Sequence, residues 1–330
     1  MSSKAKEGAD HLFEQAARLK KEIGKVIVGQ DEVIEQLLIA FFCRGHCLIV
    51  GVPGLAKTLI VSTFAAALDL QFKRIQFTPD LMPSDITGTE VLEQDSKTQA
   101  RSFRFVKGPV FANLVLADEI NRTPPKTQSA LLQAMQENFV TNNGVDHALP
   151  EPFFVLATQN PIEQEGTYPL AEAQLDRFLF QVNISYPDAA QEINIVRRTT
   201  ANEHMQAHRV LTAADVIRVQ RLLREVPISA SIEKDAVGLA RLTRPRSGEP
   251  FALIDEFVAW GAGPRASQSL VLAAKARAVL AGRNAPSRED LVFCAYPVLR
   301  HRIILNFKAH AQSLGVDSVI AQVLRRAGLS

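Results

Sequence analysis

A lysine–threonine pair behind a glycine-containing loop is the first group of residues in this chain that could do chemistry. Residues 46–58 read HCLIVGVPGLAKT, an apolar run, then a loop with two glycines, then Lys57 and Thr58. Backbone N–H groups of such a loop, and the N-terminus of the helix behind it, attract phosphate oxygens. A lysine reaches the outer phosphates and a threonine hydroxyl ligates Mg²⁺. The pattern predicts a nucleoside triphosphate site with Thr58 as a metal ligand.

One position departs from the usual form of this loop. Ala56 stands where the second glycine of the pattern G-x-x-x-x-G-K-[ST] is expected. A methyl group is small enough for the loop to close, but the loop alone is also compatible with an ordinary Gly/Pro turn before a helix. The phosphate-binding hypothesis therefore needs a matching acidic strand elsewhere in the chain.

Two adjacent carboxylates end a second apolar run, downstream of the loop. Residues 114–119 read LVLADE, and a continuous apolar run is typical of a buried parallel strand. Asp118, at the end of the strand, would hold Mg²⁺, and Glu119 would orient or deprotonate an attacking water. The alternative is a core strand with a solvated acidic turn. It is the weaker interpretation because the loop and the acidic strand occur together.

Strand-like runs alternate with helical stretches through the first half of the chain. This order predicts an α/β fold with a doubly wound parallel sheet, in which ligands lie at the carboxyl ends of the strands. Composition shifts near residue 188, where amphipathic helices replace the strands. We therefore predict a nucleotide-binding core over 1–187 and a small, all-helical second domain over 188–330.

Three further stretches have an expected structural role. Residues 78–110 are too long for an ordinary connection and predict an inserted element that projects from the core. Residues 139–149 contain an Asn-Gly turn between short strand-like runs, which predicts a hairpin. The apolar pair Ile27-Val28, followed by Gly29, either packs against an adenine ring or simply turns a strand into a helix.

Composition excludes several classes of protein. The 330 residues are 47% hydrophobic and 22% charged, with a formal net charge of +2, which fits a globular chain and does not indicate a nucleic-acid surface. No apolar run reaches the length that spans a bilayer, and residues 1–7 lack a signal-peptide core. Three cysteines cannot all pair, and buried thiols in a reducing compartment are the simplest explanation. We expect a cytoplasmic protein without stable membrane insertion.

The chain resembles the MoxR family of AAA+ ATPases along almost its full length. The variant loop that ends in Leu-Ala-Lys-Thr is itself common in that family, which reduces the difficulty posed by Ala56. Eight segments in one order carry the resemblance: 28–30 (VGQ), 51–58 (GVPGLAKT), 118–122 (DEINR), 126–132 (KTQSALL), 157–161 (ATQNP), 174–178 (QLDRF), 263–267 (GPRAS) and 298–302 (VLRHR).

The resemblance implies roles for single residues. It implies that Asn160 is a sensor beside the γ-phosphate, that Arg177 is an arginine finger, and that Arg265 is a second sensor at the start of a lid helix. The plainer alternatives are a turn-forming asparagine, a surface arginine paired with Asp176, and a solvent-facing arginine. The implied nucleotide-binding residues are Val28, Gly29, Gln30, Pro53, Gly54, Leu55, Ala56, Lys57, Thr58, Leu59 and Asp118.

The resemblance also implies an activity and partners. The expected activity is Mg²⁺-dependent ATP hydrolysis in a homo-oligomeric ring, expected to be a hexamer, with ATP held between the core and the lid and between subunits. Residues 78–110 and 139–149 would then be a helix-2 insert and a hairpin that contact a client protein. The output would be chaperone-like remodelling or metal-cofactor insertion, with a von Willebrand A-domain protein as partner.

Three alternatives for the function stay open at this point. One is the motor subunit of a metal chelatase-like complex, and another is a nucleotide-gated scaffold with little hydrolysis. The intact Glu119 and Arg177 argue against the scaffold. A nucleic-acid motor is a poorer hypothesis, because the hairpin turn at residues 142–146 reads NNGVD and is not basic.

Overall fold

A five-stranded parallel sheet forms the centre of the protein. The computed structural model describes residues 3–94, 101–162, 166–200, 205–246 and 250–329. The strand order is β2-β5-β8-β1-β9, and every neighbouring pair is parallel. This confirms the predicted α/β class. The strands are β1 (Cys47–Val50), β2 (Phe72–Gln76), β5 (Leu114–Asp118), β8 (Phe154–Gln159) and β9 (Phe180–Asn183).

The three inner strands β1, β5 and β8 are buried on both faces, which explains why they read as continuous apolar runs. Leu114 and Leu116 of β5 face one apolar core, whereas Val115 and Ala117 face the other. The first core is closed by α1 (Ser3–Val26), α2 (Asp31–Phe42) and α3 (Lys57–Ala67). The second is closed by α4 (Pro83–Thr87) and α5 (Pro125–Glu137), with the short turns η1 (Ile120–Arg122) and α6 (Glu172–Leu175) near it.

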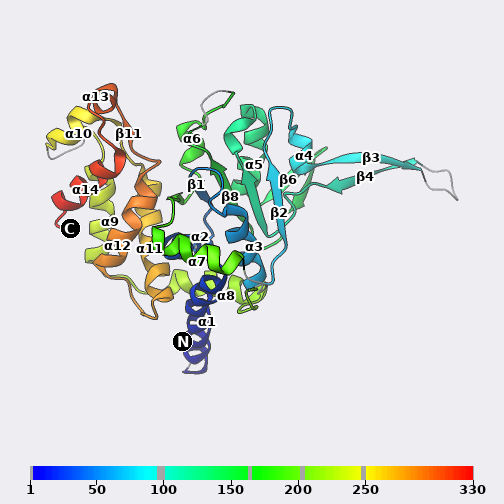
Figure 1. Ribbon diagram of the computed structural model, residues 1–330, viewed down its shortest axis with the longest axis horizontal. Helices are drawn as coiled ribbons and strands as arrows, with labels where there is room; N and C mark the ends of the chain where they lie inside the picture. The colour runs from blue at the N-terminus through cyan, green and yellow to red at the C-terminus, as the bar shows by residue number, and fades with distance from the viewer. Residues whose placement is uncertain (1–2, 95–100, 163–165, 201–204, 247–249, 330) are drawn as a thin grey trace.

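Two hairpins leave the sheet region. β3 (Gly88–Gln94) and β4 (Arg101–Lys107) form a long antiparallel pair that projects from the body of the molecule (Figure 1). This is the element predicted for residues 78–110, and its tip, 95–100, lies outside the described residues. β6 (Phe139–Asn142) and β7 (Val145–Ala148) form the second hairpin, with the predicted turn at Asn143-Gly144.

Helices dominate the second half of the chain, and those after residue 229 gather on the side of the sheet opposite the long hairpin (Figure 1). Thr212 and Asp215 have the spacing of a capping box, which predicts a helix start, and the cap is present, since the Thr212 hydroxyl accepts a hydrogen bond from the N–H of Asp215. The elements are α7 (Ala189–Thr199), α8 (Ala213–Glu225), α9 (Ala230–Leu242), α10 (Ala252–Phe257), β10 (Val258–Trp260), α11 (Pro264–Leu280), α12 (Arg288–Leu299), β11 (Ile304–Leu305), α13 (Phe307–Ala311) and α14 (Val316–Arg326).

Several predictions about these elements need correction. The second half is not all helical, because β10 and β11 pair as a short antiparallel ladder. The sequence predicts Asp31 as the cap of a helix, but Asp31 is the first residue of α2, and Gln30 occupies the cap position without a side-chain hydrogen bond. The apolar run 178–182 predicts a strand from Phe178, whereas β9 begins at Phe180. The domain boundary near residue 187 stays a prediction, because one apolar cluster runs through α1, α2, α8, α9 and α11.

All three cysteines are free and buried, as predicted. Burial raises the pKa of each thiol well above its ordinary value. These side chains therefore act as small apolar groups in the core and not as nucleophiles. Among the described residues, no group of three or more potential metal-binding side chains of His, Cys, Asp or Glu lies together.

Candidate nucleotide site and a second, arginine-lined pocket

The loop between β1 and α3 adopts two left-handed backbone positions. Gly54 has φ +86°, which glycine adopts without strain. Ala56 has φ +55° and is the residue before the first turn of α3. An alanine in this region costs on the order of 1 kcal/mol relative to glycine. The departure noted in the sequence therefore falls at a position where the backbone itself favours glycine.

A cavity of about 430 Å³ opens over this loop at the carboxyl edge of the sheet. The Lys57 ammonium is half-buried beside it and donates to the carbonyl oxygen of Gly51. Burial lowers the pKa of Lys57, while Asp118 and Glu119 attract its proton and oppose this shift. The lining residues are Pro53, Gly54, Leu55, Ala56, Lys57, Thr58, Arg74, Gln76, Asp118, Glu119 and Asn160.

Asp118 ends β5 at the wall of this cavity. Its Oδ1 accepts a hydrogen bond from the Thr158 hydroxyl (2.6 Å), and its Oδ2 pairs with the Arg74 guanidinium (2.5 Å). The Thr158 hydroxyl also accepts from the N–H of Glu119 (2.9 Å). Thr158 thus fixes one side of the carboxylate, and the half-exposed Arg74 holds the side that faces the cavity.

Glu119 follows Asp118 with a left-handed backbone, φ +57°. Its Oε2 accepts hydrogen bonds from Gln76 (2.9 Å) and Arg122 (3.1 Å). These two donors hold the carboxylate in place at one of its two oxygens. A carboxylate has about four lone-pair sites, so Glu119 can be positioned in this way and still accept a proton from water.

Asn160 directly follows β8. Since β8 is parallel to β5, Asn160 lies at the same edge of the sheet as Asp118, the last residue of β5. It lines the cavity and is 6% exposed. Its Oδ1 accepts from the N–H of Ile162 (3.2 Å), which is the turn-forming contact expected of an asparagine before proline. The two interpretations of Asn160 are therefore compatible, because one side chain shapes the turn and faces the cavity.

A second, apolar cavity of about 200 Å³ lies on the other side of the same loop. Gly54, Leu55 and Ala56 line both cavities. A Cβ on Gly29, whose φ is +75°, would come within 2.6 Å of Gln191 on α7, so the chain packs tightly there. The other lining residues are Val26, Ile27, Val28, Gln30, Leu59, Pro187, Ile195, Arg198 and Thr199.

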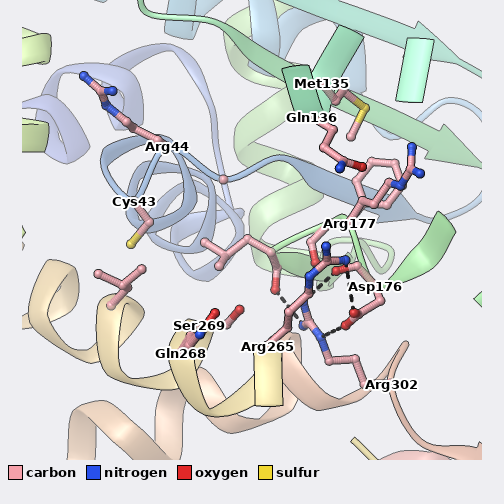
Figure 2. Close-up of a pocket in the computed structure, with 14 residues that line it drawn as sticks. Cys43, Arg44, Met135, Gln136, Asp176, Arg177, Arg265, Gln268, Ser269 and Arg302 are labelled. Carbon is pink, nitrogen blue, oxygen red and sulfur yellow. Dashed lines mark hydrogen bonds and ion pairs between the residues drawn. The ribbon is translucent and has the colours of Figure 1, made fainter. Parts of the chain in front are cut away.

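Arg177 and Arg265 lie together in a different pocket, of about 240 Å³ (Figure 2). Its wall includes Gly45 before β1 and Leu179 before β9, so it is at the amino edge of the sheet. The loop cavity is at the carboxyl edge, and a four-residue strand such as β1 alone is about 13 Å long. In this structure Arg265 therefore lies away from Lys57, and the cavity over the loop does not include the chain's own Arg265.

Asp176 is the centre of this amino-edge pocket. Figure 2 shows its carboxylate between the side chains of Arg265 and Arg302. Arg265 Nη1 is 3.3 Å from Oδ2, and Arg302 Nε is 2.8 Å from Oδ1. Arg177 does not pair with Asp176. Its Nη1 donates instead to the Leu132 carbonyl on α5 (3.1 Å).

Comparisons with known proteins decide the family. Residues 46–180 match the ATPase family associated with various cellular activities (AAA), and residues 251–323 match the AAA lid domain. The chain is 41% identical to Chaperone MoxR1 of Mycobacterium tuberculosis, over 98% of this chain and 85% of that protein. The chain belongs to the MoxR family of AAA+ ATPases. This confirms the resemblance drawn from the eight sequence segments.

Two further relatives agree with this assignment. Protein MoxR of Methylorubrum extorquens is 31% identical, over 88% of each chain. A crystal structure of a Cytophaga hutchinsonii protein superposes with a TM-score of 0.90 at 42% identity, and covers 98% of this chain and 97% of that one. The MoxR fold thus extends over both cavities and the amino-edge pocket. None of the helices that the structure describes is both long and apolar enough to cross a membrane.

The cavities of this MoxR-family chain fit a nucleotide with Mg²⁺. A polar cavity with a lysine and two carboxylates and an apolar cavity share one loop, which matches the chemistry of a triphosphate joined to a base. Thr58 and Asp118 supply oxygen ligands of the kind that Mg²⁺ prefers. Arg74 would have to release Oδ2 of Asp118 before that oxygen could bind the ion.

Several side chains at these cavities were not predicted from the sequence. Arg74 and Gln76 lie two residues apart on β2 and face the carboxylates, but Lys73 between them is also polar, so the strand FKRIQ has no pattern that singles them out. Ile195 and Thr199 are one turn apart on α7. A capping box at Asp188 and Gln191 marks the start of that helix.

Proposed function

We propose that this protein hydrolyses ATP in a homo-oligomeric ring, in which the amino edge of one copy completes the loop cavity of its neighbour. The observation that carries the proposal is the separation of Arg177 and Arg265 from the Lys57 cavity in the same chain. The resemblance to the family supports a hexamer in the cytoplasm.

The residues of the carboxyl edge bind ATP and position the attacking water. The Lys57 ammonium turns from the Gly51 carbonyl to the outer phosphates, and Val28 and Leu59 hold the base by apolar contact beside Gln30. Thr58 and Asp118 would hold Mg²⁺, which would neutralise charge on the phosphate oxygens. Asn160 orients the attacking water beside the γ-phosphate, and Glu119 takes its proton.

The residues of the amino edge complete the site from the next subunit. Arg177 and Arg265 approach the γ-phosphate of the neighbour and stabilise the charge that develops in the transition state. Within one chain, neither side chain lines the Lys57 cavity. A head-to-tail contact between different surfaces of identical subunits forms a ring when its rotation closes, which is the geometry that this division of residues needs.

The two hairpins form the proposed contact surface for a client protein. Phe105 of β4 stacks on His147 of β7 with ring centroids 4.1 Å apart, and Asn143 donates to Glu90 of β3 (2.6 Å). Phe103 on the long hairpin is 71% exposed, and Leu92 opposite it is also exposed. Such a surface suits a client protein with apolar segments. Chaperone-like remodelling, with a von Willebrand A-domain partner and metal-cofactor insertion as one form of it, follows from the family.

Mixing two inactive variants tests this function. Lys57→Ala loses its own phosphate site but keeps both arginines, whereas Arg177→Ala has the opposite defect. Each alone should retain little turnover. Mixed in equal amounts and allowed to exchange subunits, they should recover up to about a quarter of the wild-type rate, the share of neighbouring pairs that join two intact halves.

The controls define the result. Size-exclusion chromatography checks that each variant assembles, and a fluorescent ATP analogue checks that Arg177→Ala still binds nucleotide. A mixture that stays inactive while mixed rings form would contradict completion of the site between subunits. Full turnover by Arg177→Ala alone would remove that arginine from the site.

A further inference from the structure

The segment Val298–Arg302 has no role in the function proposed above. It lies where α12 ends, and it packs against the loop that precedes β9. Its last residue, Arg302, has a side chain that is only 3% exposed. A guanidinium stays charged at any physiological pH and is costly to bury without partners. The structure must therefore supply partners, and their identity indicates what Arg302 does.

Arg302 donates to four backbone carbonyls and one carboxylate. Within its own helix end it binds the carbonyl of Val298 (2.6 Å), an acceptor that a helix C-terminus leaves open. Across the interface it binds the carbonyls of Leu179 (3.1 Å), Phe178 (2.7 Å) and Asp176 (3.3 Å). Its Nε donates to the Asp176 carboxylate (2.8 Å). The guanidinium thus holds the chain on both sides of Arg177.

His301 adds a second contact to the same loop. Its Nε2 is 3.0 Å from the carbonyl oxygen of Phe178, so this nitrogen carries the proton and donates. On the opposite side, the N–H groups of Asp176, Arg177 and Phe178 donate to carbonyls of α6. The loop is therefore fixed through its N–H groups by α6 and through its carbonyls by the end of α12.

We propose that Arg302 is a positioning residue, which holds Arg177 and Arg265 as one rigid pair for the phosphates of the neighbouring copy. Asp176 is the bridge, because one of its oxygens binds Arg302 and the other binds Arg265. The planar fork of a guanidinium can satisfy several acceptors in one fixed geometry, which the ammonium of a lysine cannot. This inference rests on the proposed completion of the site between subunits.

The proposal explains an arrangement that a single chain does not need. Arg177 and Arg265 come from segments 88 residues apart, on the sheet side and on α11 (265 − 177 = 88). Two arginines that must meet the same phosphate need a fixed mutual position, since a misplacement of about 1 Å can cost about a hundredfold in rate. The lid therefore carries one of the two arginines and also determines where the other one stands.

Arg302→Gln, studied in the full-length assembly, tests the proposal. We expect turnover to fall about 30-fold to 100-fold, with affinity for a fluorescent ATP analogue unchanged, because the Lys57 cavity is untouched. Mixed with Lys57→Ala, the variant should recover activity as Arg177→Ala does. Mixed with Arg177→Ala it should stay inactive, because both variants then lack the amino edge.

Arg300→Gln is the matched control. Arg300 is two residues away and also sits at the end of α12, but it pairs with Asp317 on α14 (2.8 and 2.9 Å) and does not touch the Arg177 loop. Its loss should leave turnover within about twofold of wild type, as expected for a residue outside the site. Equal losses in both arginine variants would indicate a general role in lid stability and would overturn the proposal.

Asp176→Asn gives a second route in case Arg302→Gln does not fold. Asparagine keeps the size of the half-exposed Asp176 but removes the charge that joins Arg302 to Arg265. We expect about a tenfold loss of turnover, unchanged analogue affinity and rescue by Lys57→Ala. Wild-type turnover in Asp176→Asn would overturn the proposal.

The mixtures distinguish a failure of the positioning role of Arg302 from a failure of the site shared between subunits. If Arg177→Ala and Lys57→Ala restore each other but Arg302→Gln or Asp176→Asn is not restored, the shared site stands and the positioning role is wrong. If none of these mixtures recovers activity, the completion of the site between subunits has itself failed.

Discussion

The two edges of the central sheet hold their charged groups in opposite ways. At the carboxyl edge, Asp118 and Glu119 bind through partners that are partly exposed, Arg74 and Arg122. At the amino edge, Asp176 binds Arg302, which is almost completely buried. Exposed ion pairs contribute little and break easily, whereas a buried guanidinium with several partners does not move without large cost.

This difference fits the tasks proposed for the two edges. Groups that receive a nucleotide must exchange their partners, since Lys57 and Asp118 each bind a protein group that ATP or Mg²⁺ would replace. Groups that reach into a neighbouring subunit have no ligand of their own to adjust to. They are best held in advance, because prepositioned charge needs no reorganisation when the reaction occurs.

The largest effect is expected from the base at the carboxyl edge. Glu119→Gln keeps the size of the side chain but cannot accept a proton, so turnover should fall about a thousandfold. Nucleotide affinity should stay near wild type, and rings should hold unhydrolysed ATP, measured by chromatography of the bound nucleotide after rapid desalting. Bound nucleotide that is mainly ADP would show that another group activates the water.

The assignment of Arg265 to the amino edge predicts a smaller loss. Arg265→Ala should lower turnover about 50-fold by removing one charge from the neighbour's transition state. In mixtures it should be restored by Lys57→Ala and by Glu119→Gln, but not by Arg177→Ala. If Arg265→Ala were restored by Arg177→Ala and by neither of the other two variants, Arg265 would act on the nucleotide of its own chain. The proposed difference between the two edges would then be wrong.

The apolar cavity predicts an effect on affinity rather than on turnover. Ile195→Glu puts a charge against the base and should weaken ATP binding about 10-fold to 30-fold, with turnover at saturating ATP nearly unchanged. Val196→Glu is the control, because Val196 is the next residue on α7, is exposed and does not line the cavity. Equal affinities in the two variants would argue against this cavity as the base site.

The smallest expected effect concerns pH and the amino edge. His46, directly before β1, donates to the Met135 carbonyl (3.1 Å) and accepts from the Val155 N–H (3.0 Å). Burial lowers its pKa to about 4, against 6.5 for a free histidine. Below about pH 6.5 the unfolded chain therefore binds a proton that the folded chain rejects, and stability falls as the pH falls toward about 4.

Because the pKa of His46 is lowered by folding, a measurable loss of stability is expected at lower pH. Between about pH 7 and about pH 5.5, His46 should lower the free energy of unfolding by about 1 kcal/mol. His46→Gln, compared with wild type by urea denaturation at both pH values, should show a smaller decrease, although it is less stable at about pH 7. An identical decrease in both proteins would mean that His46 does not contribute to the pH dependence.

Local patterns were sufficient to predict the carboxyl edge. The loop before Lys57, the acidic pair and Asn160 each follow an apolar strand directly, so the parallel order of the sheet brings them together. The same reasoning missed Arg74 and Gln76, because a polar residue inside a short strand has no distinctive spacing. It also missed the short β10–β11 ladder, since two or three residues give no periodic pattern.

The amino edge shows where this kind of prediction ends. The motif residues around Arg177, Arg265 and Arg302 are visible in the sequence, and the family resemblance attached roles to the first two. Which cavity each arginine enters depends on how α11 and α12 pack against the start of β9, and no sequence pattern encodes that packing.

Chemistry that depends on neighbouring residues was thus readable from the chain alone: a triphosphate loop, an acidic strand end and an α/β sheet. The placement of Arg177 and Arg265 at the amino edge, away from the Lys57 cavity, was decided only by tertiary structure. Its physical reason is the set of long-range hydrogen bonds through which Arg302, 123 to 126 residues away in the sequence, holds the backbone of the Arg177 loop.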